Sequence, residues 1–73
     1  MYRILIVDDE AFITDSLAFL LENQKKLELE VARAYSANEA LEVLNHAVFQ
    51  IVIYEIEMPG MSGLELLREI KSK

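Results

Sequence analysis

The sequence predicts an α/β fold, a three-layer parallel sheet with elements in the order β-α-β-α-β-α. Three observations predict it. Short apolar runs alternate along the chain with segments of helical periodicity. The runs at 4–7 and 51–54 are continuously apolar, as in interior parallel strands. Two of the helical segments begin after a serine that stands three residues before a glutamate, the capping-box pattern of a helix start.

Composition limits both the fold and the function. The chain has 73 residues, no cysteine, one histidine and a net charge of −6. This length predicts one domain over residues 1–73, and the cysteine and histidine counts exclude disulfides, thiolate zinc sites and multi-histidine metal sites. The acidic balance argues against direct nucleic-acid binding. No apolar run approaches the ~20 residues of a membrane span, and the N-terminus lacks a signal peptide's apolar stretch, so we expect a cytoplasmic protein without membrane contact.

The first strand, 2–7, ends in the acidic run Asp8-Asp9-Glu10, and a helix is expected from Ala11 to about Asn23. Its apolar arc is wider than one sheet face requires. The arc combines two neighbouring stripes, Ile13, Leu17, Leu20 and Gln24 beside Phe12, Ser16 and Phe19.

The segment 27–31 alternates apolar and acidic residues, which predicts a half-exposed strand at an edge. Ser36 and Glu39 then form a capping box, in which Glu39 reaches back to the cap. The helix that follows is expected to turn four residues inward, namely Ala40, Leu41, Leu44 and Val48.

The run 51–54 reads as a second buried strand, and the Pro-Gly pair within 58–61 predicts a turn. Ser62 and Glu65 form the second capping box. The last helix is expected to present the stripe Leu64, Leu67 and Ile70.

Carboxylates follow both strands that read as interior. Parallel strands end at one edge of the sheet, so Asp8, Asp9 and Glu55 are expected to converge there if the two strands are neighbours. Oxygen ligands with room for waters suit Mg²⁺ rather than zinc or copper. The alternative is that the acids before the first helix only favour its N-terminal dipole.

The runs ILIVDDE at 4–10 and IVIYEIEMPGMSG at 51–63 closely resemble the receiver domain of bacterial two-component response regulators. The resemblance covers the whole chain and implies a flavodoxin-like fold, with strand order 2-1-3 for the three strands present. It implies that the parent protein takes part in a phosphorelay, in which a histidine kinase is the partner that donates the phosphoryl group. In that family the phosphoryl group is accepted by an aspartate.

The resemblance also assigns roles to residues. Asp8 and Asp9 match the acid pair that holds Mg²⁺ with the phosphoacceptor, and Asp9 is the expected direct ligand. Glu57 matches the position that lends its backbone carbonyl to the metal. Glu55 matches the phosphoacceptor position, where the family has aspartate. The extra methylene displaces the nucleophile, so we expect little or no phosphorylation at Glu55 and weakened Mg²⁺ binding. We also expect no enzymatic activity, because a phosphate-stabilising loop or lysine is missing from the sequence.

The chain ends after its third helix, whereas a complete receiver continues with two strands that carry a hydroxyl residue and a lysine. We therefore expect a truncated receiver domain, the first three βα units, with the strand 51–54 at an unprotected edge. That edge and the apolar arc of the first helix form an exposed apolar surface, which predicts self-association, most simply a homodimer. A monomer with a disordered third strand is the alternative.

Three functions follow from these features. The chain is a receiver-derived signalling fragment, or it is a natural or engineered half-flavodoxin module for assembly without signalling activity. The third function is a Mg²⁺-dependent phosphatase. The absence of a glycine-rich phosphate loop and of a positioned lysine from the sequence argues against it.

Overall fold

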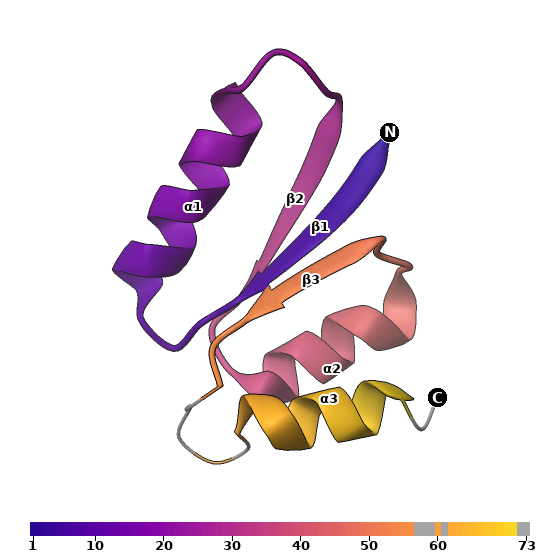
Figure 1. Cartoon of the computed structure of the whole chain (residues 1–73). Coiled ribbons are helices and arrows are strands. Elements are labelled where there is room, and N and C mark those ends of the chain that lie inside the picture. Colours follow the sequence, from indigo (N-terminus) through magenta and orange to yellow (C-terminus); the bar gives the residue numbers. More distant parts are fainter. Residues whose placement is uncertain (57–59, 61, 72–73) are drawn as a thin grey trace.

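The computed structural model describes residues 1–56, 60 and 62–71. Its elements follow the predicted β-α-β-α-β-α order, which is confirmed (Figure 1). They are β1 (Tyr2–Val7), α1 (Ala11–Asn23), β2 (Leu29–Ala34), α2 (Ala37–His46), β3 (Ile51–Tyr54) and α3 (Gly63–Lys71). The predicted turn at 58–61 lies outside the described residues except for Gly60, whose φ of 83° is in the left-handed region that favours glycine.

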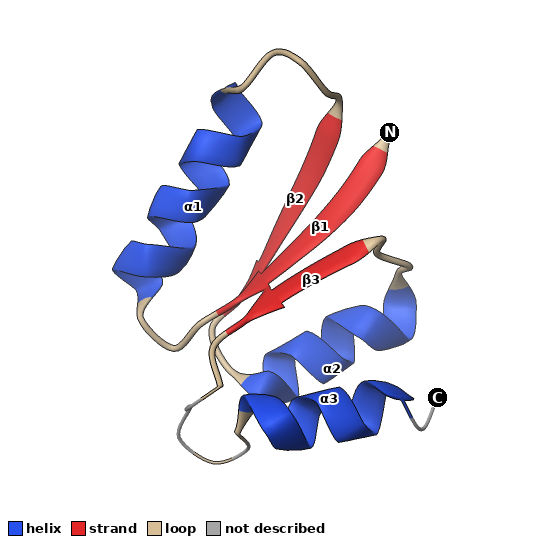
Figure 2. Cartoon of the chain, viewed as in Figure 1, coloured by secondary structure: helices blue, strands red, loops and turns tan. Residues whose placement is uncertain are grey.

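The three strands form one parallel sheet in the order β2-β1-β3, as predicted. The register pairs Val7 of β1 with Ala34 of β2 and with Tyr54 of β3. Figure 2 shows the three arrows side by side and pointing the same way. The carboxyl ends of all three strands therefore meet at one edge of the sheet, and Asp8 and Glu55 are the first residues beyond two of them.

Helices cover both faces of the sheet, which gives the predicted three layers (Figure 2). On one face α1 packs its Ala18 against Ile4 and Ile6 of β1. On the other face α2 and α3 lie against Leu5 and Val7 of the same strand. Every residue from Ile4 to Val7 is buried because β1 is the central strand with a helix layer on each side. The continuous apolar run of β1 is explained by this position.

The strand β3 has a similar apolar run but a different environment. Val52 and Tyr54 pack into the core under α2 and α3, whereas Ile51 and Ile53 are exposed. The prediction of an edge position for this strand is confirmed, and the prediction from its apolar run that both faces are buried is wrong. The physical reason is that α1 lies over the β1 and β2 side of its face of the sheet (Figure 1).

The inward face of α1 differs from the predicted stripes. Its buried residues are Thr14 and Ala18, with Leu17 and Leu21 packed beside them. Small residues face the sheet because they let the helix approach it closely. The remaining large apolar residues of the predicted stripes are exposed, and these are Phe12, Ile13, Phe19 and Leu20.

Two further apolar residues were placed wrongly. Val48 follows the end of α2 and is 74% exposed, so it does not continue the inward face of that helix. Leu64 is 60% exposed, and Leu66 takes the core position in α3 with none of its surface accessible. Ile70 packs against the same core, as predicted.

Both predicted helix starts are present. Ser36 Oγ accepts a hydrogen bond from the Glu39 amide at 3.1 Å, and Ser62 Oγ accepts one from the Glu65 amide at 3.3 Å. In a capping box the Glu39 carboxylate would accept from the amide of the cap residue, Ser36. Here it accepts instead from the amide of the preceding residue, Tyr35, at 3.4 Å. Within the ranges described above, no helix has the length and apolar character needed to cross a membrane.

Candidate functional site

Asp8 lies at the centre of the carboxyl edge of the sheet. Its backbone amide donates to the Ala34 carbonyl at 3.2 Å, which extends the β1–β2 pairing by one residue. The side chain is in a buried residue, 8% exposed, and its Oδ1 accepts a hydrogen bond from the Glu10 amide at 2.9 Å. A buried carboxylate needs such a partner or a cation, since burial in low dielectric disfavours its charge.

Glu55 follows β3 beside Asp8. Its backbone amide donates to the Val7 carbonyl at 3.1 Å, so the end of β3 is tied to the end of β1. The side chain is exposed, and its Oε1 accepts a hydrogen bond from the amide of the next residue, Ile56, at 3.1 Å. The sheet therefore brings the Asp8 and Glu55 backbones together, as the order of strands predicts, while the Glu55 carboxylate bonds its own chain.

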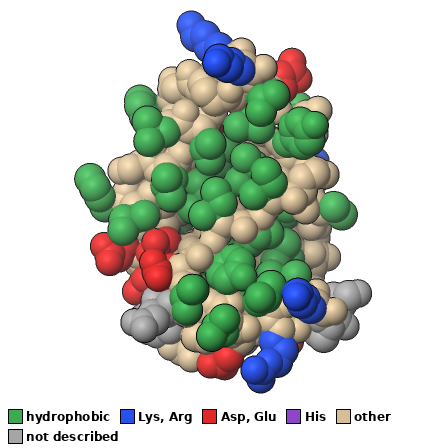
Figure 3. Space-filling model, viewed as in Figure 1, with side chains coloured by type: hydrophobic (Ala, Val, Ile, Leu, Met, Phe, Trp, Pro, Cys, Tyr) green, Lys and Arg blue, Asp and Glu red, His purple; other side chains and the backbone are tan. Residues whose placement is uncertain are grey.

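Asp9 and Glu10 connect β1 to α1 and are exposed. Glu10 is the N-cap residue of α1, but its side chain makes no capping hydrogen bond, and the first turn of α1 contains no acidic residue. The alternative that these acids only favour the N-terminal dipole of α1 stays a prediction. Figure 3 shows Asp and Glu side chains gathered at the lower left of the molecule, near the start of α1.

Gly63 brings α3 against the end of β3. Its amide donates to the Ile56 carbonyl at 2.6 Å. A Cβ at this position would press on the Glu55 carbonyl oxygen and the Ile56 Cα, and would lie 2.9 Å from the Tyr54 ring. Only glycine permits this close approach of α3 to the backbone of Glu55 and Ile56. The sequence pattern assigned Gly63 no role of its own, although Gly63 stands directly after the Ser62 cap and ends the run 51–63.

The donor set suits a hard cation, because its side-chain donors are carboxylate oxygens. Among residues 1–56, 60 and 62–71, no three His, Cys, Asp or Glu side chains are grouped so that they could hold a metal ion. Asp8 and Asp9 supply two carboxylates, and Glu57, the predicted carbonyl donor, lies outside the described residues. Mg²⁺ keeps several waters and is bound in many sites by one or two carboxylates, so the residues present fit this ion.

A polar cluster away from this edge was not anticipated. The Tyr35 hydroxyl donates to Asp15 Oδ1 at 2.8 Å, and Arg33 contacts Asp15 at 3.7 Å and Glu22 at 3.1 Å. The hydrogen bond to Asp15 raises the pKa of the Tyr35 phenol above its ordinary value, with desolvation and the Asp15 charge acting in the same direction. The cluster ties α1 to β2 and its following loop, and a sequence gives no signal for it because the partners lie far apart in the chain.

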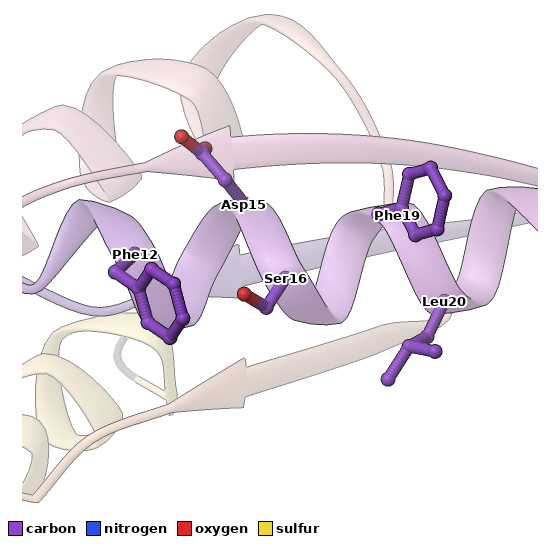
Figure 4. A pocket seen from close by; sticks show the side chains of 5 residues that line it. All are labelled: Phe12, Asp15, Ser16, Phe19 and Leu20. Carbon is purple, nitrogen blue, oxygen red and sulfur yellow. The ribbon is translucent and has the colours of Figure 1, made fainter.

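The outer surface of α1 carries an apolar pocket of about 440 Å³. Figure 4 shows Phe12 and Leu20 on one side of the helix with Ser16 between them, and Asp15 and Phe19 complete the lining. In Figure 3 hydrophobic side chains cover the middle of this face, over the region between α1 and β3. The surface predicted from the wide apolar arc is therefore exposed among the described residues.

A three-stranded parallel α/β sheet with acidic residues after two neighbouring strands defines a class of doubly wound proteins with a site at the carboxyl edge. The particular family follows from the sequence. Residues 4–73 match the family described as the response regulator receiver domain, and the chain belongs to that family. Its members are regulatory domains of two-component systems.

Curated relatives agree with this assignment. The chain is 38% identical over 72 residues to the uncharacterized transcriptional regulatory protein YesN of Bacillus subtilis, covering 99% of this chain and 20% of that protein. It is 38% identical over 71 residues to the regulatory protein VanR of Enterococcus faecium, covering 97% of this chain and 29% of VanR. The chain thus spans less than a third of either relative.

Solved structures show the same fold. The response regulator TrrA of Thermotoga maritima in complex with Mg²⁺-BeF is 40% identical with a TM-score of 0.88, and the match covers 99% of this chain and 60% of that one. TrrA in complex with the histidine kinase ThkA is 41% identical with a TM-score of 0.80, covering 100% of this chain and 60% of that one.

Proposed function

We propose that residues 1–73 form the first three βα units of a cytoplasmic receiver domain whose carboxyl-edge site binds Mg²⁺ through Asp8 and Asp9. The strongest support for this proposal is the position of the acidic residues at the carboxyl edge of the sheet. Asp8 and Glu55 follow neighbouring parallel strands joined by the hydrogen bond from the Glu55 amide to Val7. The receiver TrrA, which is similar over nearly the whole chain, was crystallised with Mg²⁺-BeF.

Glu55 occupies the phosphoacceptor position in this proposal and accepts no phosphoryl group. A glutamate carboxylate stands one methylene further from the backbone than an aspartate, and phosphoryl transfer is sensitive to such displacement of the nucleophile. The hydrogen bond from the Ile56 amide to Glu55 Oε1 supports this, since it turns the carboxylate back toward its own chain. The site then keeps an unphosphorylated carboxylate at Glu55.

In the parent protein the partner is a histidine kinase. The complex between TrrA and the kinase ThkA supports this partner for a chain that is 41% identical to TrrA. The proposed role is therefore signal transduction by a receiver whose site binds a cation without accepting a phosphoryl group.

Mg²⁺ titration followed by amide chemical shifts tests the metal site. We expect saturable shifts centred on Asp8, Asp9 and Glu10 in the unmodified chain. Asp9→Ala should weaken the affinity by about 10-fold or more, as loss of a ligand or of its supporting partner does. Glu28→Ala is the matched control, because it removes one exposed acid at the opposite end of the sheet, just before β2.

The control variant should keep the affinity of the unmodified chain. Equal affinity in the Asp9→Ala chain would reject Asp9 as a ligand. Shifts spread evenly over the acidic surface, and lost equally in both variants, would mean nonspecific attraction by the charge of −6 and would reject the site.

A second candidate function, assembly without signalling, is favoured by the apolar surface. β3 pairs with β1 alone among the described strands, and its Ile51 and Ile53 are exposed. The neighbouring α1 exposes Phe12 and Phe19, with 82% and 64% of their surfaces accessible. An unpaired strand edge beside apolar side chains invites a second chain, and antiparallel pairing of two β3 strands satisfies a two-fold axis.

The solution mass by light scattering on a sizing column, with and without Mg²⁺, tests this candidate. We expect a homodimer for the unmodified chain and a monomer for Ile53→Lys, since a charge on an edge strand opposes pairing. Leu64→Lys is the control, because it places the same charge at an exposed leucine of α3. A folded monomer in the unmodified chain contradicts self-association.

A further inference from the structure

Two buried polar residues of the described chain contact each other. Asp8 is 8% exposed and Thr14 is completely buried. The Thr14 hydroxyl donates to the Asp8 carbonyl oxygen at 3.1 Å and lies 3.4 Å from the Glu10 carbonyl oxygen. The buried hydroxyl of α1 is therefore satisfied at the end of β1, next to the acidic residues.

A threonine inside a helix commonly returns its hydroxyl to the carbonyl four residues earlier. Here the shorter contact is made by the Thr14 hydroxyl with a residue six positions back, outside the helix. Two more hydrogen bonds close the connection. The Thr14 amide donates to the Glu10 carbonyl at 3.1 Å, and the Glu10 amide donates to Asp8 Oδ1 at 2.9 Å.

These bonds hold the segment from Asp8 to Glu10 from both sides. One side is the sheet, where the Asp8 amide is paired with Ala34, and the other is the buried face of α1. Asp9 lies in the middle of this segment, so the backbone from which its carboxylate extends is fixed at both neighbours. A metal site depends on such supporting contacts, whose loss weakens metal binding by about 10- to 100-fold.

We infer that Thr14 is a positioning residue of the acidic site, which holds the Asp8–Glu10 backbone in the arrangement that binds the cation. The inference rests on the proposed Mg²⁺ site. Thr14 is completely buried, and it acts through the Asp8 carbonyl. The sequence pattern gave it no role, because a single threonine between two apolar stripes has no periodic signature.

Thr14→Val and Thr14→Ser test the inference together. Valine keeps the volume of threonine and removes the hydroxyl, whereas serine keeps the hydroxyl. Two quantities are measured: the Mg²⁺ dissociation constant from amide shifts, and, without Mg²⁺, the hydrogen-exchange rate of the Glu10 amide relative to that of Ala18 in the middle of α1. The relative rate separates local loosening of the 8–10 segment from global unfolding.

We expect Thr14→Val to raise the dissociation constant by about 10-fold or more and to speed Glu10 exchange relative to Ala18. Thr14→Ser should stay near the unmodified chain in both quantities. The inference is overturned if valine leaves both unchanged, or if exchange rises equally at Glu10 and Ala18, because Thr14 would then only stabilise the fold.

Failure of the proposed function is a separate result. If the unmodified chain binds no Mg²⁺, the metal site is rejected and the relative exchange rate alone decides the role of Thr14. Selective acceleration at Glu10 in the valine variant then upholds positioning of the segment, and an unchanged ratio rejects it.

Discussion

The backbone amide of Glu55 donates a hydrogen bond to the carbonyl oxygen of Val7 at 3.1 Å, one residue beyond the last paired position of β1 and β3. This bond places Glu55 beside Asp8, although 46 residues separate them in the chain. The parallel sheet thus builds the candidate site from two distant segments. The stability of the elements around this bond and the chemistry of Glu55 are both open to measurement.

Gly63→Ala should destabilise the fold by about 3 kcal/mol, the upper end of the range for overpacking, because the added Cβ meets backbone atoms that cannot move aside. Gly60→Ala is the matched control. Its Cβ would meet open space, so its cost of about 1–2 kcal/mol comes only from the left-handed φ. Urea unfolding of both variants measures the difference. An equal loss in the two variants would show that the close approach of α3 to β3 is unimportant.

Leu66→Ala and Leu64→Ala separate the two leucines of α3. Leu66 has no accessible surface, so its truncation should lower the free energy of unfolding by about 2–5 kcal/mol. Leu64 is exposed, so the same truncation should change it by no more than about 0.5 kcal/mol. Denaturant midpoints of both variants test this assignment. If Leu64→Ala cost more than Leu66→Ala, the sequence-predicted stripe would be right and the observed orientation of α3 wrong.

The Tyr35 phenol should titrate above its ordinary pKa of 10.0 because its hydroxyl donates to Asp15. Phenolate absorbance isolates this group when the titration of Tyr35→Phe is subtracted. Asp15→Ala should bring the pKa of Tyr35 back toward the ordinary value. An unchanged titration in Asp15→Ala would rule out the hydrogen bond as the cause.

The raised pKa of Tyr35 makes the free energy of unfolding depend on pH. A folded-state pKa above the unfolded value means that the folded chain holds the phenolic proton more tightly. The contribution is fully present below pH 10.0 and is lost as the pH rises through the raised folded-state pKa. Unfolding free energies of the unmodified chain and Tyr35→Phe should therefore converge above that pH. Curves that stay parallel would contradict the coupling.

Much of the fold could be predicted from the sequence because its elements differ in pattern. The continuous apolar run predicted β1, and the serine caps predicted the starts of α2 and α3. The helical periodicity after the first strand predicted α1 at Ala11–Asn23, as observed. The apolar run of β3 predicted burial on both faces, but burial depends on which strands and helices lie beside it. Pattern alone cannot separate a central strand from an apolar edge strand.

The candidate site was predictable to a similar extent. The acids at the strand ends could be recognised because parallel topology brings such ends together. Thr14 and Gly63 could not be recognised, since one acts through a buried hydroxyl and the other through the absence of a side chain. The hydrogen bond between the Glu55 carboxylate and the Ile56 amide depends on the side-chain rotamer of Glu55. The sequence pattern does not predict that rotamer.

The most direct test of the account is the intact mass of the chain and of Glu55→Asp after incubation with Mg²⁺ and a small phosphodonor such as acetyl phosphate. The unmodified chain should gain no mass, because Glu55 is displaced as a nucleophile. Glu55→Asp should gain one phosphoryl group, and the addition of Asp9→Ala to that variant should abolish the gain. Phosphorylation of the unmodified chain at Glu55, or no gain in Glu55→Asp, would contradict a receiver site at this edge that is silenced by glutamate.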